Sequence, residues 1–228
     1  GTGAWQPLKV GDILTSGTVL QTAADSRVDL VLGDPKAVAG SAKVGLPFGA
    51  AGPGSSSGGG SGPSSVDQNF IRLMENTVMS IDKLTATDTG ADIVTDTQLD
   101  LRAGRIFGTV KKLSAGSRYE VKIPNGVAGV RGTIYMLTAL GDCSVYEGSV
   151  AMALTDSSGE VTTRIINAMQ KYNALEDILS DLGAQGQNEM RLLASASQPP
   201  RRGSYPYPLP QPRRVDRPYL PPDEGWNG

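Results

Sequence analysis

The sequence predicts a mainly β protein, and three observations carry this prediction. Short apolar segments with alternating polar residues recur along the chain and are separated by turns that contain glycine, asparagine or aspartate. Glycine accounts for 29 of the 228 residues, whereas aromatic residues make up only 5%. The apolar segments are all shorter than the roughly 18 residues that a membrane-spanning helix needs, so we expect no membrane span.

The first strands are expected at Val10–Leu14, Gly17–Thr22 and Arg27–Gly33. The β pattern resumes from Asn69 to Leu84, around a corner at Asn76-Thr77. Side chains of these two types hydrogen-bond nearby backbone groups and therefore suit a tight corner.

Two further strands are expected around Ala103-Gly104, between Thr97 and Leu113, and another over Ser117–Ile123. Strands are also expected over Ile134–Leu140, Ser144–Glu147 and Ser149–Leu154.

The segment Val121–Tyr135 is expected to contain two β segments that flank a turn with three glycines, Gly126, Gly129 and Gly132. Such glycines indicate positive φ or a neighbour that a Cβ would hit. A phosphate-binding loop would need a helix after the turn and a Gly-Lys-Ser/Thr motif, and both are missing here. We therefore predict a structural turn in which Arg131 pairs with a carboxylate or with buried carbonyls.

The region after residue 160 is expected to be a helical extension over 161–197. Residues 162–172 fit either a helix or a buried strand. Asn173–Gly183 predicts a helix with a capping box at Asn173 and Glu176, and Gln187–Ala196 predicts a second one.

Two segments have compositions that cannot form a packed core by themselves. Residues 35–68 form a Gly/Ser-rich insertion in a domain that we expect to span residues 1–160. Residues 198–228 are rich in proline and predict an extended polyproline II tail, either solvated or docked on a partner. Its candidate contact residues are Tyr205, Tyr207, Arg213, Arg214 and Tyr219.

Several of these strand and turn segments, in the order in which they occur, resemble the FecR-type domain, a family of bacterial extracytoplasmic β-domains. The resemblance runs from Trp5 to Leu154 and is interrupted by the insertion. Its signature residues are Asn76, Thr77, Gly126, Gly129, Arg131, Gly132 and Thr133. The resemblance implies a compact β-solenoid or sandwich and an extracytoplasmic location, with a signal peptide removed. Regulatory members also carry an anti-sigma region and a membrane helix, which the sequence given does not contain.

The composition argues against catalysis. Histidine is absent, so the commonest general base and metal ligand are missing, and we predict no catalytic residue, cofactor or metal site. Asp92, Asp96 and Asp100 lack the spacing of a calcium loop. The single cysteine, Cys143, is either a buried apolar residue or the site of an intermolecular disulfide. The net charge of −2 does not indicate a nucleic-acid partner.

Two functions remain open at this point. The first is a self-assembling, non-enzymatic subunit of an extracellular filament or surface layer, in which the tail contacts the neighbouring subunit. The alternative is a periplasmic sensor or ligand-binding module that recognises a partner protein or a cell-wall glycan.

Overall fold

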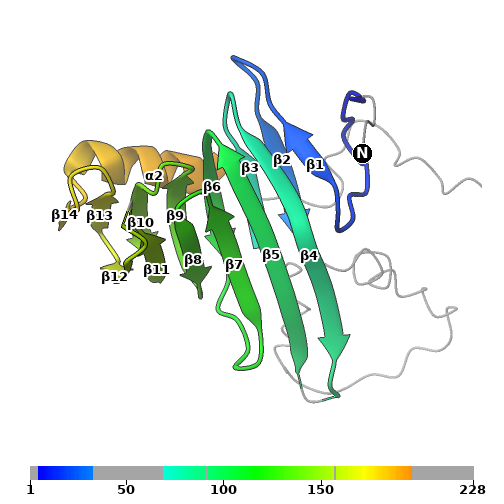
Figure 1. Cartoon of the computed structure of the whole chain (residues 1–228). Coiled ribbons are helices and arrows are strands. Elements are labelled where there is room, and N and C mark those ends of the chain that lie inside the picture. The colour runs from blue at the N-terminus through cyan, green and yellow to red at the C-terminus, as the bar shows by residue number, and fades with distance from the viewer. Residues whose placement is uncertain (1–4, 33–68, 91, 157, 197–228) are drawn as a thin grey trace, which may run out of the picture. The chain divides into compact units, whose positions relative to one another are not determined.

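The computed structural model describes residues 5–32, 69–90, 92–156 and 158–196. These residues form two seven-stranded β-sheets and one helix (Figure 1). Sheet A contains, in spatial order, β1 (Val19–Gln21), β4 (Val78–Asp88), β5 (Ile93–Ala103), β7 (Arg118–Ile123), β8 (Gly126–Val130), β11 (Ser149–Thr155) and β12 (Val161–Asn167). Sheet B contains β14 (Ile178–Asp181), β13 (Gln170–Asn173), β10 (Cys143–Glu147), β9 (Thr133–Thr138), β6 (Arg105–Val110), β3 (Asn69–Leu73) and β2 (Val28–Leu32).

The chain passes repeatedly from one sheet to the other. The hairpins β4–β5, β7–β8 and β11–β12 belong to sheet A, and β9–β10 and β13–β14 belong to sheet B. All strand pairs are antiparallel except β5 and β7, which β6 separates in sequence. The fold thus stacks two sheets, as in a sandwich, with hairpins that alternate along the chain as in a solenoid. This arrangement confirms the predicted fold class.

One hydrophobic core lies between the two sheets. Alternate residues of each strand point inward, so Met79, Leu99 and Val121 of sheet A pack with Ile71 and Leu137 of sheet B, all fully buried. Burial of such side chains contributes about 1.5–3 kcal/mol each.

The core also contains a tyrosine pair and the cysteine. Tyr135 is fully buried opposite Gly108, where an added Cβ would lie 2.6 Å from the Tyr135 Cζ. The hydroxyl groups of Tyr135 and Tyr119 are 3.4 Å apart, and burial raises the pKa of both phenols. Cys143 is buried and free, and burial raises the pKa of its thiol to about 12. It therefore behaves as a small apolar residue.

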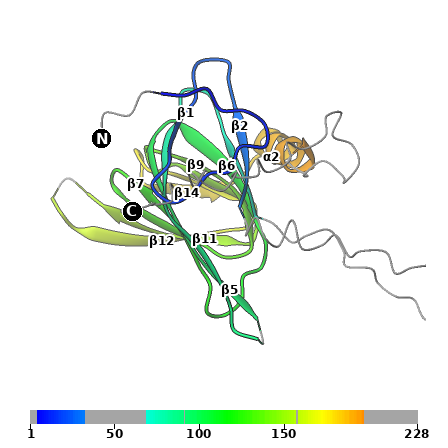
Figure 2. The same ribbon diagram turned by 90° about the vertical axis from the view of Figure 1, so that its right-hand side faces the viewer.

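Helix α2 (Ala184–Ala196) packs on the outer face of sheet B, beside β9 and β10 (Figures 1 and 2). Met190 is its buried residue and lies against Phe107 and Leu182. The guanidinium of Arg72 on β3 donates to both carboxylate oxygens of Asp29, at 2.7 and 2.8 Å, and to the Ala196 carbonyl, at 3.3 Å. This buried arginine thus ties β2 and β3 to the last residue of the helix.

The predicted helix over Asn173–Gly183 is wrong, and the second one, over Gln187–Ala196, is confirmed as part of α2. Residues 170–173 and 178–181 form the hairpin β13–β14 instead. The ambiguous segment 162–172 contributes β12 and the start of β13, which extend both sheets beyond residue 160.

The strand expected at Val10–Leu14 is also wrong. Residues 5–12, described by themselves, contain a turn in which the Lys9 N–H donates to Asp12 Oδ2 at 2.7 Å and Gly11 has a φ of 96°. The Gly/Ser-rich insertion and the proline-rich tail lie outside the described residues.

Candidate functional site

Four of the signature residues, Asn76, Thr77, Gly132 and Thr133, fall into two corners that share one design. In each corner, a residue with positive φ precedes a buried threonine, and the threonine faces a glycine with positive φ that joins two strands. We name them the Asn76 corner (Asn76, Thr77, Gly104, Arg105) and the Gly132 corner (Gly132, Thr133, Gly148, Ser149).

The Asn76 corner is closed by several hydrogen bonds. The Thr77 Oγ1 accepts a hydrogen bond from the Arg105 N–H at 3.1 Å and donates to a carbonyl, that of Arg105 at 3.0 Å or of Glu75 at 3.2 Å. The Thr77 N–H donates to Thr22 Oγ1 at 2.9 Å. A Cβ on Gly104 would lie 2.6 Å from the Asn76 carbonyl oxygen, so no larger residue fits there.

The Gly132 corner has fewer hydrogen bonds. The Thr133 Oγ1 donates to the Ser149 carbonyl at 2.8 Å. A Cβ on Gly148 would lie 2.9 Å from Thr133 Oγ1 and still closer to the Gly132 carbonyl oxygen. A Cβ on Gly132 would lie 3.2 Å from Lys112 Cα, so the turn between β8 and β9 presses against the chain that follows β6.

The remaining signature residues differ from the expectation. Gly126 and Gly129 do not lie in a turn, because residues 126–130 form strand β8. A Cβ on Gly126 would lie 3.0 Å from Leu154 Cα, whereas one on Gly129 would meet only Ala151 O, at 3.7 Å. Arg131 is exposed and makes no ion pair or hydrogen bond within the described part of the chain, so the predicted pairing with a carboxylate or with buried carbonyls is not formed there.

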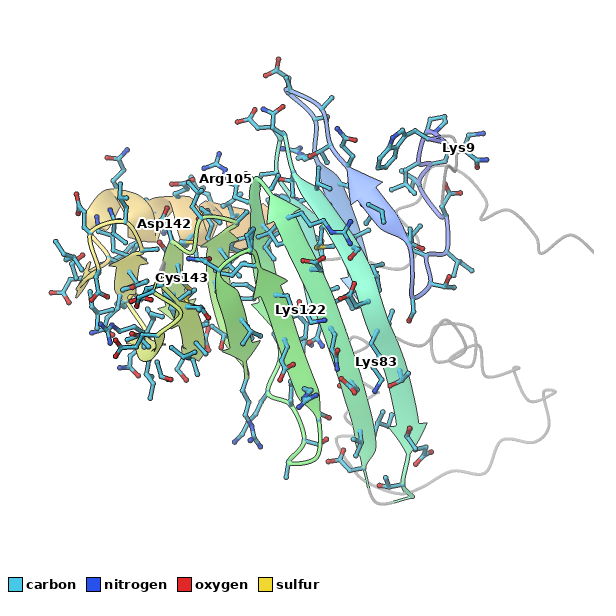
Figure 3. The ribbon with its side chains drawn as sticks, in the orientation of Figure 1. Lys9, Lys83, Arg105, Lys122, Asp142 and Cys143 are labelled. Atoms are coloured by element: carbon cyan, nitrogen blue, oxygen red, sulfur yellow. The ribbon has the colours of Figure 1, made fainter. Side chains whose placement is uncertain are left out.

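Each corner borders a shallow depression. The Asn76 corner lines one of about 750 Å³, together with Glu75, Arg102, Pro124, Asn125 and Leu140. The Gly132 corner lines one of about 710 Å³, together with Thr109, Lys111, Lys112, Arg131 and Glu147. Both depressions carry arginines. Arg105, labelled in Figure 3, pairs with Glu75 at 3.9 Å in the first, whereas Arg131 has no such partner in the second.

The outer face of sheet A is divided into two halves of different chemistry. Over β4, β5 and β7 it is charged: Lys122 pairs with Asp82 at 3.0 Å, and Arg102 with Asp100 at 2.8 Å. Lys83 pairs with Asp96, and the two lysines lie on this face in Figure 3. We call these residues the charged half.

Local hydrogen bonds favour the ionised form of two carboxylates of the charged half, those of Asp82 and Asp96. The Ser80 hydroxyl, followed by Lys122, lowers the pKa of Asp82. The Lys83 ammonium holds the pKa of Asp96 below its ordinary value. These groups neutralise one another on the surface, and such a set of ion pairs suits a solvated face.

The other half of this face, over β8, β11 and β12, carries no charged side chain. Its outward residues alternate with core residues along each strand. They are Val127, Gly129, Ser149, Ala151, Ala153, Thr155, Val161, Thr163, Ile165 and Asn167. Val161 and Ile165 are 62% and 60% exposed. We call this set the uncharged half.

Strand β12 is the last strand of sheet A in the described residues, so one of its backbone edges has no neighbour there. Its one charged residue, Arg164, does not face outward with Val161 and Ile165 but pairs with Asp177 at 2.7 Å. Proteins commonly protect an edge strand with an outward charge. The outward side of β12 has no such charge, and Arg164 on the opposite side is its one charged residue.

Sequence reasoning missed two features of these sites. Gly148 was not singled out, although a single glycine between two β segments is its detectable signal. The uncharged half was not predicted because its residues come from three separate segments of the sequence. The tail residues Tyr205, Tyr207, Arg213, Arg214 and Tyr219 lie outside the described residues, so their role stays a prediction.

Within the described ranges, no three His, Cys, Asp or Glu side chains gather where they could hold a metal ion. The same part of the chain contains no helix with the length and apolar character needed to cross a membrane.

Comparisons with known proteins gave two kinds of match. Residues 64–151 match the family model described as FecR protein. Two crystal structures of a "putative anti-sigma factor" from Parabacteroides distasonis ATCC 8503 align with TM-scores of 0.46 and 0.47 at 13% identity. Each alignment covers 74% of this chain and 61% of theirs, so the chain spans about three fifths of those proteins. A search of curated proteins found no match.

Proposed function

Because residues 64–151 match the family model described as FecR protein, we propose that the protein is a non-enzymatic, extracytoplasmic binding module that recognises another protein. The family match supports the sensor-like alternative drawn from the sequence better than the filament subunit that came first there. A module of this kind needs a surface suited to a protein partner, and the uncharged half of sheet A provides one.

The observation that carries the proposal is the combination of the uncharged half with the open edge of β12. Exposed backbone N–H and C=O groups on an edge strand can pair with an added strand of a partner. Val161 and Ile165 stand beside that edge and are more than half exposed. A partner strand would gain backbone hydrogen bonds from the edge and apolar contacts from these two side chains.

The charge distribution on the outer face of sheet A favours an uncharged partner segment at the edge of β12. The charged half is neutralised by its own ion pairs, and the uncharged half has no group to pair with an incoming charge. A charged segment would lose hydration there without compensation. We therefore expect the partner to contribute a strand with small or apolar side chains.

Site-specific photo-crosslinking in the source cells tests this function. A photoreactive residue placed at Ile165 should give one discrete product with a different protein, and the same probe at Thr85, which is exposed on β4, should not. Adding Val161→Lys to the Ile165 probe should reduce the product at least tenfold, because a lysine ammonium disfavours strand addition.

The matched variant Thr85→Lys, combined with the Ile165 probe, should leave the product unchanged. Unaltered thermal unfolding of both lysine variants would exclude misfolding as the cause. A product of twice the mass of this chain would overturn the proposal in favour of self-assembly. Crosslinking that is insensitive to Val161→Lys would also overturn it.

A further inference from the structure

We propose that the depression beside the Gly132 corner binds a phosphorylated, hydroxyl-bearing small molecule such as a sugar phosphate. This inference goes beyond the proposed function, because it uses no residue of the uncharged half. It rests on unpaired cations, a buried hydroxyl without a partner and a nearby free carboxylate.

Three segments meet at this depression. The end of β6 contributes Thr109 and Val110 and is followed by Lys112, the turn before β9 contributes Arg131, and the end of β10 contributes Glu147. The backbone of Gly132 presses against Lys112, as the 3.2 Å distance from a Cβ on Gly132 to Lys112 Cα indicates. Arg131 and Lys112 therefore start from neighbouring points of the backbone.

These two cations have no counterion among the described residues. Neither Arg131 nor Lys112 makes an ion pair or a side-chain hydrogen bond there. An anion bound between these two side chains would be attracted by both positive charges. The planar guanidinium of Arg131 can donate two parallel hydrogen bonds to a phosphate, and the ammonium of Lys112 adds a second positive charge.

A buried hydroxyl adds a third group. The Oγ1 of Thr109 is shielded from solvent and has no hydrogen-bond partner in the described residues. Most buried polar atoms in proteins have a partner, so an orphan hydroxyl in a depression indicates a missing one. Thr109 lines this depression, and its hydroxyl can donate to an oxyanion or accept from a hydroxyl of the ligand.

The size and the remaining walls favour more than a lone phosphate. A volume of about 710 Å³ lies within the range of small-molecule sites, which span roughly 300–1,000 Å³. Val110 and Ile134 supply apolar surface beside the cations. Glu147 makes no ion pair among the described residues, and its carboxylate can accept hydrogen bonds from ligand hydroxyls. Its negative charge opposes the phosphate, and the two cations must outweigh this repulsion.

The Asn76 corner provides the internal contrast. Its arginine, Arg105, has a carboxylate neighbour, Glu75, at 3.9 Å. The same backbone design thus leaves a free cation at one corner only. Phosphate affinity is accordingly assigned to the Gly132 corner and not to its counterpart.

Amide chemical shifts of the full-length, ¹⁵N-labelled protein test the proposal. The probes are glucose 6-phosphate, inorganic phosphate and glucose, each added to millimolar concentration. Glucose 6-phosphate should shift signals of residues 109–112, 131–134 and 147 and bind several-fold more tightly than phosphate, and glucose should not bind. Arg131→Gln should weaken binding about tenfold or more, as expected for a lost hydrogen bond between charged groups.

Two variants keep the test decisive. Arg105→Gln removes the arginine of the other corner and should change the affinity less than twofold. Thr109→Val keeps the shape of the side chain and should weaken binding about two- to tenfold, the effect of one lost neutral hydrogen bond. Absence of shifts with glucose 6-phosphate, equal binding of phosphate, or equal effects of Arg105→Gln and Arg131→Gln would each overturn the proposal.

Discussion

The Asn76 corner and the Gly132 corner share one backbone arrangement but differ in the number of hydrogen bonds that hold them. Both place a buried threonine hydroxyl against a strand junction at a glycine with positive φ. At the Asn76 corner, Thr22 reaches in from the start of the domain, and Thr77 both accepts and donates hydrogen bonds. At the Gly132 corner, the only hydrogen bond described for the Thr133 hydroxyl is its donation to Ser149.

The shared residues thus determine the backbone conformation of both corners, while the surrounding side chains determine whether a corner can bind a ligand. The Asn76 corner makes more contacts within the protein, including the approach of Arg105 to Glu75. The Gly132 corner leaves Arg131 and Lys112 available to a ligand. We therefore expect changes at the first corner to affect stability more, and changes at the second to affect binding.

The largest effect is expected from Gly148→Ala and Gly104→Ala. Each adds a Cβ where backbone already lies, at a residue with a φ of 82° or 78°. Steric overlap and strain together should lower the free energy of unfolding by about 3 kcal/mol or more in urea denaturation. Gly159→Ala is the control, because Gly159 has a φ of 86° but nothing within 4 Å of an added Cβ. It should cost only about 1 kcal/mol, and an equal loss in all three would contradict the role of the corners.

The next effect should separate the corners. Thr77→Val leaves the Arg105 N–H without its partner and should lower the free energy of unfolding by about 2 kcal/mol. Thr133→Val removes a donor to one carbonyl and should cost about 1 kcal/mol. Urea denaturation of both variants measures this ordering. A larger loss for Thr133→Val would show that the Gly132 corner is the more closed of the two.

An exchange of the left-handed residues should have a smaller, asymmetric effect. Asn76 has a φ of 53°, which glycine adopts readily, so Asn76→Gly should change the free energy of unfolding by less than about 0.5 kcal/mol. Gly132→Asn places a Cβ 3.2 Å from Lys112 Cα and should cost about 1–2 kcal/mol. Thermal unfolding of the two variants would reveal the asymmetry, and equal shifts of Tm would refute it.

The smallest effect on stability is expected from the arginines. Arg105→Gln breaks an exposed ion pair at 3.9 Å and should cost at most about 0.5 kcal/mol. Arg131→Gln removes no pair among the described residues, so the free energy of unfolding should not fall measurably. A clear destabilisation by Arg131→Gln in urea would indicate that Arg131 makes a structural contact, and would contradict its availability to a ligand.

The sequence predicted the β character and the Asn76-Thr77 corner because both depend on local chemistry. Alternating apolar residues mark the strands, and the side chains at a corner hydrogen-bond to nearby backbone. Burial of Cys143 was one of two alternatives and is the one observed. The three glycines of 126–132 were assigned to one turn because spacing alone does not distinguish a strand glycine, such as Gly126, from a turn glycine, such as Gly132.

The helix that was predicted at Asn173–Gly183 but is not formed shows that a local sequence pattern does not include tertiary contacts. The Asn173 half of the predicted capping box does form, since Asn173 Oδ1 accepts hydrogen bonds from the Leu175 and Glu176 N–H groups. Glu176 instead accepts from the Asn173 side-chain amide, at 3.3 Å. The helix does not continue, because Asp177 adopts a φ of 51° and is held by Arg164 and by the Tyr172 hydroxyl. Tertiary contacts thus override a favourable local signal.

The two halves of sheet A were also beyond sequence reasoning. Whether Lys122 lies beside Asp82 or beside an uncharged strand depends on the order and register of strands that are distant in sequence. A shift of one residue would turn every side chain to the opposite face. Surface chemistry of this kind becomes visible only once the pairing is known.

The alternation of hairpins between the sheets has a consequence for how the molecule folds. Within its sheet, each of these hairpins pairs with an earlier and a later strand: β9–β10 pairs with β6 and β13, and β7–β8 pairs with β5 and β11. Stability in such an arrangement is close to a sum of nearest-neighbour couplings. Opening should therefore begin at the terminal hairpin β13–β14 and travel inward, so amide-exchange protection would rise stepwise towards β4–β5.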